Sequence, residues 1–162
     1  MAAPICGRSP ISYPSNGGQL VFNFAIQDVL FSIKPRYAEQ ILNGRKTVEL
    51  RRRFTNSAVT GAFAFIYSTS PVCELVGYAR IQNVLRMSVE DIWRGYREAA
   101  GIDRPSFDSY FEGRQEGYVI VLDNPTRLED GVPIADLRRR FGFVPPQSFR
   151  YVTREYHALI RS

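Results

Sequence analysis

The sequence predicts an α+β domain whose curved or barrel-like sheet is flanked by helices. With 162 residues, of which 44% are hydrophobic and 13% aromatic, the chain is long enough for one well-packed domain and too short for two comfortable ones. Segments with strand and helix patterns follow one another without strict alternation. This order disfavours a doubly wound parallel sheet and favours a small mixed domain.

The N-terminal residues differ in composition from the rest of the chain. Residues 1–19 contain three prolines and three glycines and show little hydrophobic periodicity, which is typical of a flexible segment. Residues 20–27 have a strand-like composition and would form either an edge strand or a helical turn. We therefore expect a flexible N-terminal tail over residues 1–27 and a folded domain over residues 28–162.

A strand, a short helix and a second strand open the expected domain. An apolar run predicts a strand over Val29–Ile33, and Pro35 suits the first position of a helix that continues to Leu42. Asn43 and Gly44 are a strong helix stop. Alternation predicts the next strand over Thr47–Arg51. Val48 and Leu50 would face the core, and Thr47, Glu49 and Arg51 would lie on the opposite, polar face.

The later elements are delimited by caps and glycines. Ser88 begins a sequence typical of a capping box, and single glycines end the three helices that follow. The predicted elements are strands over Ala62–Ser68, Glu74–Gln82 and Gly117–Leu122, helices over Ser88–Ala100, Ser106–Phe111 and Ile134–Phe141, a last strand or turn within residues 147–153, and a terminal helix over Arg154–Ile160.

Charge and residue counts narrow the classes of function. The formal net charge of +5 and a pI near 9.5 favour polyanionic partners, nucleic acid first. His157 is the only histidine, so a His-rich zinc site is excluded. Cys6 and Cys73 lack CxxC spacing, and the acidic residues are not clustered, so we expect no metal and no cofactor. No apolar run of about 18 residues or secretory signal is present, so we expect a cytoplasmic protein without a membrane span.

Charged residues gather on the second predicted strand, directly after a tight turn. Glu49 and Arg51 lie two residues apart and therefore point to one face, where they would form an ion pair or recognise a ligand together. Lys46, at the entry of the strand, would reach a phosphate, and its pKa would fall if it were desolvated beside Arg45 and Arg51. The alternative is a solvated sheet edge with ordinary surface ion pairs.

Two further segments supply candidate ligand contacts. Ser32 and Lys34 share one face of the first strand, close to the helix start, where an anion would be stabilised. Gln147 and Ser148 follow two prolines that fix the approach of the chain, and they would read a base edge. In the alternative interpretation, Ser32 and Lys34 lie at an ordinary strand end, and Gln147 and Ser148 lie in a plain rigid turn.

The stretch SIKPRYAEQILNGRKTVELRRRF resembles the opening of an ASCH domain, a branch of the PUA-like superfamily. The pieces AGIDRPSFDSYFEG and PPQSFRYV resemble the middle helices and the C-terminal strand of the same family, so the likeness covers Val29 to Tyr151. The resemblance implies a small PUA-like β-barrel flanked by helices. It also implies a cleft between barrel and helices that takes RNA or a nucleoside-like ligand.

One class of small ASCH enzymes, the N4-acetylcytidine amidohydrolases, is similar to this chain over GRKT. The resemblance places the catalytic lysine of that class at Lys46, its nucleophilic threonine at Glu49 and its catalytic glutamate near Glu98. A carboxylate does not replace a threonine hydroxyl in the same acyl transfer, so the chain departs from that enzyme at position 49. Other ASCH proteins have been linked to ribonuclease activity or to RNA binding.

These observations support three hypotheses. The first is an ASCH domain that binds RNA or a modified nucleoside. The second is a hydrolase of the same fold, either a ribonuclease or an amidohydrolase, and the third is a protein-interaction module. A catalyst needs Lys46 within hydrogen-bond reach of another polar group in a concave pocket, whereas a binding module needs only an open basic lip. The candidate catalytic residues are Lys46, Glu49 and Glu98, and the candidate ligand-binding residues are Ser32, Lys34, Arg45, Thr47, Arg51, Gln147 and Ser148.

Overall fold

A computed structural model of the chain describes residues 26–55 and 59–160. Most of the tail expected over residues 1–27 therefore lies outside the described residues. The described chain forms a six-stranded sheet with strand order β2-β5-β4-β3-β1-β6. Only the β1–β3 pair is parallel, and the other four pairs are antiparallel. The strands are β1 (Val29–Ile33), β2 (Val48–Arg51), β3 (Phe63–Ser68), β4 (Glu74–Ser88), β5 (Glu116–Pro133) and β6 (Phe149–Tyr151).

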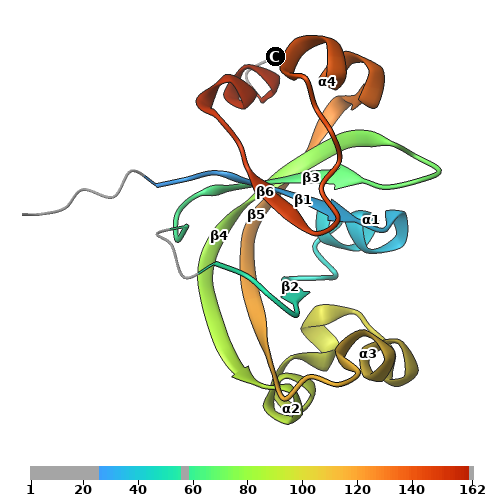
Figure 1. Cartoon of the computed structure of the whole chain (residues 1–162), viewed down its shortest axis with the longest axis vertical. Helices are drawn as coiled ribbons and strands as arrows, with labels where there is room; N and C mark the ends of the chain where they lie inside the picture. Colours follow the sequence, from blue (N-terminus) through green and yellow to red (C-terminus); the bar gives the residue numbers. More distant parts are fainter. Residues whose placement is uncertain (1–25, 56–58, 161–162) are drawn as a thin grey trace, which may run out of the picture.

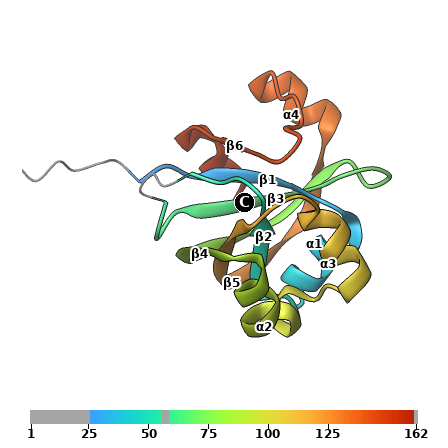
Figure 2. The same cartoon turned by 60° about the horizontal axis from the view of Figure 1, so that its bottom comes forward.

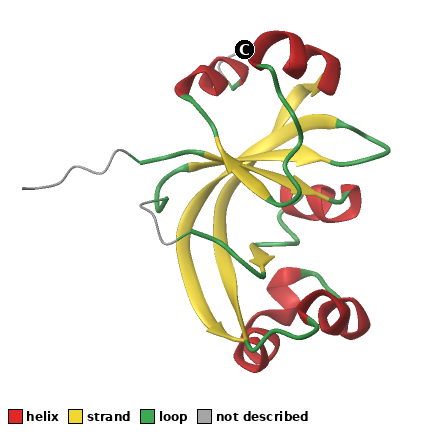
Figure 3. Ribbon diagram, viewed as in Figure 1, coloured by secondary structure: helices red, strands yellow, loops and turns green. Residues whose placement is uncertain are grey.

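Helices lie around this sheet rather than between its strands. Figure 3 shows two groups of helices near opposite ends of the molecule, with α1 beside the middle of the sheet. The sheet curls into a half-barrel, so the predicted α+β fold with a curved sheet flanked by helices is confirmed. The helices are α1 (Pro35–Leu42), α2 (Val89–Ala100), α3 (Arg104–Phe111), α4 (Ile134–Phe141) and the 3₁₀ helix η1 (Arg154–Leu159).

The long strands β4 and β5 carry the curvature of the sheet (Figure 1). Their register shifts at three places, and each shift is a bulge or irregularity that bends the pair and increases its twist. At Gly77 the strands approach so closely that an added Cβ would lie 2.5 Å from the carbonyl oxygen of Thr126 and 2.5 Å from Leu42 Cδ2. Glycine at this position therefore lets the end of α1 pack directly on the bent sheet.

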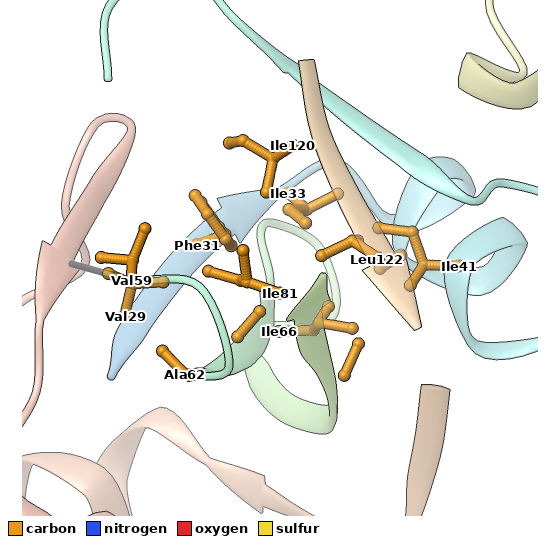
Figure 4. Close-up of a cluster of buried hydrophobic side chains, with 13 residues drawn as sticks. Val29, Phe31, Ile33, Ile41, Val59, Ala62, Ile66, Ile81, Ile120 and Leu122 are labelled. Carbon is orange, nitrogen blue, oxygen red and sulfur yellow. The ribbon is translucent and has the colours of Figure 1, made fainter. Parts of the chain in front are cut away.

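Three clusters of buried side chains hold the helices to the sheet. The first lies beneath α1 and contains Phe31, Ile41 and Ile120 (Figure 4). The second joins α4 and η1 to the sheet through Leu137 and Leu159. The third packs α2 and α3 against β2 and β5. Burial of these apolar side chains is the main stabilising contribution to the arrangement.

Most predicted element starts lie within one residue of the observed ones, and four predicted features need correction. Strands β4 and β5 extend to Ser88 and Pro133, well beyond the predicted ends, because they pair with each other over most of their length. Helix α3 begins at Arg104, since the Asp103 carboxylate accepts the backbone N–H of Ser106 at 2.8 Å and provides the N-cap expected of Ser106. The terminal helix is a 3₁₀ helix.

Candidate functional site

A cavity of about 1020 Å³ lies between the curved sheet and the helices α1 and α3. Its lining comes from segments far apart in the sequence: the end of β1, the start of α1, β2, the β3–β4 connection, α3, and the segment 145–147 that precedes β6. A volume of this size is at the upper end of the range for small-molecule sites. The cavity is therefore large enough for a nucleotide.

Strand β2 places two charged side chains on the wall of this cavity. Val48 and Leu50 belong to the cluster beneath α2 and α3, whereas Glu49 and Arg51 line the cavity, as the alternation predicts. Leu50 also reaches the cavity lining. Lys46 lies at the entry of the strand, where its backbone N–H donates to the carbonyl of Gln40 at 2.9 Å. The turn after α1 therefore delivers the lysine to the same wall.

Lys46, Glu49 and Arg51 form one buried charged cluster. Only 5%, 8% and 6% of their surfaces are exposed. Lys46 Nζ lies 3.3 Å from Glu49 Oε2 and donates to the carbonyl of Ala100 at 2.8 Å. Arg51 contacts the other carboxylate oxygen, Oε1, at 3.1 Å. A single carboxylate is thus shared by two cations, and desolvation makes each of these contacts stronger than a surface ion pair.

Arg51 also connects β2 to the far side of the cavity. Its guanidinium donates to Ser148 Oγ at 3.3 Å and to the carbonyl of Ser32 at 3.2 Å, and it lies 5.0 Å from the centre of the Phe31 ring. Arg51 Nε and Ser32 Oγ are buried and have no hydrogen-bond partner among the described residues. Both residues line the cavity, but these two atoms are themselves covered by protein.

The electrostatics of the cavity favour an anion. Among the described side chains that line the cavity, Glu49 is the only acidic one. Five are cationic: Lys34, Arg36, Lys46, Arg51 and Arg52. Burial lowers the pKa of Lys46, and the charge of Arg51 adds to this effect, while Glu49 opposes it. Burial, followed by the interaction with Cys73, raises the pKa of Tyr67 to about 12, so this phenol stays protonated at neutral pH.

The structure brings together seven of the ten predicted site residues. The seventh, Ser148, accepts a hydrogen bond from Arg51 on the cavity wall. The other six line the cavity themselves: Ser32, Lys34, Lys46, Glu49, Arg51 and Gln147. Three residues lie elsewhere. Arg45 is exposed and its side chain bonds to Asn43, and Thr47 is exposed before the start of β2. Glu98 is exposed on α2 and lines a separate hollow.

Sequence reasoning missed several residues of the cavity wall. Tyr37 and Arg36 follow Pro35 on α1, Tyr110 donates from α3 to the carbonyl of Leu50 at 3.2 Å, and Tyr67 ends in the cavity beside Cys73. The place of Arg36 was accessible from the sequence, because it lies in the first turn of a helix already linked to anion binding. Tyr67 and Tyr110 come from elements far along the chain, and no local sequence pattern indicates that they line the cavity.

The described residues contain no group of three or more His, Cys, Asp or Glu side chains that would hold a metal ion. Within the same residues, every helix is too short or too polar to span a bilayer.

The sequence of this chain matches a known domain family. The model of the ASCH domain matches residues 31–126, which is more than half of the chain. The chain belongs to the ASCH domain family. The matched region contains the Lys46–Glu49–Arg51 cluster but ends before Gln147 and Ser148.

Relatives of known structure share the architecture of this ASCH domain. An ASCH domain-containing ribonuclease from Zymomonas mobilis is 29% identical over 130 residues, which cover 80% of this chain and 86% of the relative. The crystal structure of ASCH from Zymomonas mobilis has a TM-score of 0.76 at 28% identity, covering 82% of this chain and 92% of that one. The N-terminal domain of Staphylothermus marinus McrB, at 12% identity and a TM-score of 0.53, covers 82% of this chain and 91% of its own, and shares the fold alone.

Proposed function

We propose that this ASCH domain binds RNA and seats one nucleotide in the cavity between the sheet and helices α1 and α3. The observation that carries the proposal is the buried cluster on the cavity wall, where Lys46 and Arg51 flank Glu49 at 3.3 and 3.1 Å. The cations suit a phosphate, and the carboxylate suits the N–H groups of a base edge. A solvated sheet edge would not hold three charged side chains at this depth.

Two further observations support RNA as the ligand. Tyr37, Tyr67 and Tyr110 line the same cavity, and aromatic rings are the usual partners of unstacked bases in single-stranded RNA. The relative from Zymomonas mobilis that shares 29% identity carries the name ribonuclease. Lys34, Arg36 and Arg52 at the cavity would hold the phosphates that flank the bound nucleotide.

The binding proposal is tested with a fluorescent single-stranded RNA and the purified protein. Lys46→Met keeps the length of the side chain and removes its charge, so we expect the dissociation constant to rise about tenfold or more. Arg94→Ala is the matched control, because Arg94 is exposed on α2 and already paired with Glu90 and Asp91. Wild-type protein that binds no RNA at low salt, or equal loss in both variants, contradicts the proposal.

A second candidate function is cleavage of the bound strand. Lys46 lies within contact distance of a second polar group, Glu49, in a concave cavity, which is the geometry that a catalyst requires. In this proposal the Glu49 carboxylate takes the proton of a ribose 2′-hydroxyl, whose oxygen attacks the adjacent phosphorus. The bond to the 5′-oxygen breaks, and the Lys46 ammonium protonates that oxygen. The products are a 2′,3′-cyclic phosphate and a free 5′-hydroxyl.

Lys46→Arg separates cleavage from binding. Arginine keeps the positive charge and does not release its proton near neutral pH, so this variant should bind RNA and lose turnover. Cleavage is followed on a labelled RNA, and the cyclic end is identified by its resistance to phosphatase. N4-acetylcytidine serves as a second substrate, on which we expect no deacetylation because Glu49 stands at the position of the threonine nucleophile. Cleavage that persists in Lys46→Arg overturns the proton-transfer role.

A further inference from the structure

The two edge strands of the sheet, β2 and β6, come together through side chains on one side of the half-barrel. They lie at opposite ends of the strand order, so no backbone ladder joins them. In Figure 2 the chain that leaves β2 passes beside β1 and β6. We call residues 51–55 and 147–151 the seam. Three contacts join its two segments: Arg51 donates to Ser148 Oγ at 3.3 Å, the Phe54 and Phe149 ring centres lie 4.7 Å apart, and Tyr151 Oη donates to Thr55 Oγ1 at 2.6 Å.

One end of the seam is part of the cavity wall. Arg51, Arg52 and Gln147 line the cavity. From Ser148 to Tyr151 the strand advances about 10 Å, at about 3.3 Å per residue. Arg52, Gln147 and Tyr151 are all exposed, so a strand that leaves the cavity meets this surface without passing through the protein. The outer end of the seam is therefore within reach of a nucleotide that adjoins the one in the cavity.

Tyr151 presents an aromatic ring at this outer end. It is 36% exposed, whereas Phe149 on the same strand packs against the first buried cluster. The hydrogen bond to Thr55 and an edge contact with Phe149, at 6.2 Å between ring centres, hold the ring in place. An exposed ring in a fixed orientation is a platform on which a base of single-stranded RNA stacks, whatever the base.

The charge of the seam is entirely positive. Residues 51–53 are three arginines, Arg150 is the only other ionisable cation of the two segments, and neither segment contains an acidic residue. Arg52 and Arg53 are exposed. Guanidinium groups beside an exposed aromatic ring suit the alternating phosphates and bases of a single strand.

Arg150 lies on the other face of β6 from Tyr151. Its register partner on β1 is Leu30, which belongs to the second buried cluster, whereas the partner of Tyr151 is Val29, which belongs to the first. Successive side chains of a strand point to opposite faces. Arg150 is therefore an exposed cation of the same strand that a nucleotide stacked on Tyr151 does not contact.

We infer that the seam is a second nucleotide subsite, in which the base stacks on Tyr151 and the phosphates pair with Arg52 and Arg53. The inference rests on the proposed RNA binding and gives it a substrate class, an oligonucleotide rather than a free nucleotide. A free nucleotide occupies the cavity alone, whereas a longer strand also covers the seam. Because stacking does not read base edges, the seam accepts purines and pyrimidines alike.

The test compares adenosine 5′-monophosphate with RNA tetranucleotides of adenosine and of uridine. Wild type should bind both tetranucleotides more tightly than the monophosphate. Tyr151→Leu removes the ring and should weaken both tetranucleotides about fivefold or more, while binding of the monophosphate stays unchanged. Tyr151→Phe loses only the bond to Thr55 and should keep most of the wild-type affinity. Lys46→Met should weaken all three ligands.

Arg53→Ala and Arg150→Ala form a matched pair that does not depend on how well Tyr151→Leu folds. Arg53→Ala should weaken the tetranucleotides and lower the slope of log affinity against log salt by about 0.7, whereas Arg150→Ala should change neither. Equal losses in the two variants would indicate a diffuse attraction and overturn the subsite. Loss of monophosphate binding in Tyr151→Leu would place the action of the ring in the cavity and also contradict it.

The failure of the subsite differs from the failure of RNA binding. If Lys46→Met weakens binding while Tyr151→Leu and Arg53→Ala retain every wild-type affinity, the subsite is wrong and the proposed function stands. If wild type binds none of the three ligands, both proposals fall together.

Discussion

Lys46 Nζ lies 3.3 Å from Glu49 Oε2, and the side chains of both residues are at least nine-tenths buried. Arg51 holds the other oxygen of the same carboxylate at 3.1 Å. The cluster therefore contains two buried cations and one buried anion. Because burial penalises an unpaired charge far more than a paired one, the three residues do not contribute equally to stability.

Glu49→Gln should destabilise the protein more than Lys46→Met. The glutamine leaves two cations facing each other without a counter-charge, at a cost of about 3–5 kcal/mol in the free energy of unfolding. The methionine leaves Glu49 paired with Arg51 and only the Ala100 carbonyl without its donor, at a cost of about 1 kcal/mol. Urea unfolding at pH 7 measures both. Equal losses of stability in the two variants would show that the Glu49 carboxylate is not the shared partner of Lys46 and Arg51.

The pH dependence of stability should carry the signature of Lys46. Burial holds the pKa of Lys46 in the folded protein below its ordinary value of 10.5, which the unfolded chain retains. Between these two pKa values the unfolded state binds the extra proton, so the free energy of unfolding rises with pH. The stability of wild type relative to Lys46→Met should therefore increase as the pH is raised towards 10.5 and should be lowest below the folded pKa. Urea unfolding of both proteins from pH 7 to 10 gives this difference, and a decrease would contradict it.

The sequence was informative where the governing interactions are local. The bounds of α1 follow from Pro35 and from the Asn43-Gly44 stop, and alternation along β2 separates Val48 from Glu49. These features depend on neighbours within a few residues, so pattern and propensity suffice to predict them.

Contacts between distant segments could not be predicted in the same way. The bond from Arg51 to Ser148 joins residues 97 positions apart, and nothing in the local pattern of either residue indicates it. Glu98 was placed by resemblance alone, and its distance from Lys46 depends on how α2 packs on the sheet. The Gln40 side-chain oxygen, which lacks a hydrogen-bond partner among the described residues, is buried because the Gly101 turn packs on α1. Tertiary packing, which no local pattern records, decides all three.

Lys34→Ala and Arg45→Ala should differ in the salt dependence of RNA binding. Lys34 precedes α1 and lines the cavity, whereas Arg45 follows α1 outside it, and both are exposed. Loss of one phosphate contact lowers the slope of log affinity against log salt by about 0.7 for a single strand. We expect this change for Lys34→Ala and none for Arg45→Ala, by fluorescence anisotropy between about 50 and 200 mM salt. A lower slope for Arg45→Ala alone would instead place Arg45 in the interface and the RNA at the C-terminal end of α1.

Gly77→Ala and Gly95→Ala should change stability in opposite directions. At Gly77 an added Cβ would lie 2.5 Å from the Thr126 carbonyl oxygen, so the β4 and β5 backbones must separate, at a cost of about 1–3 kcal/mol. At Gly95, within α2, nothing lies within 4 Å of an added Cβ, and alanine should stabilise the helix by about 0.5–1 kcal/mol. Urea unfolding measures both changes.

The same Cβ at position 77 would also meet Leu42 Cδ2 at 2.5 Å, so Gly77→Ala should displace the end of α1 and weaken RNA binding, whereas Gly95→Ala should leave binding intact. A stable Gly77→Ala protein with unchanged affinity would show that the bend of the sheet does not position α1 for the cavity.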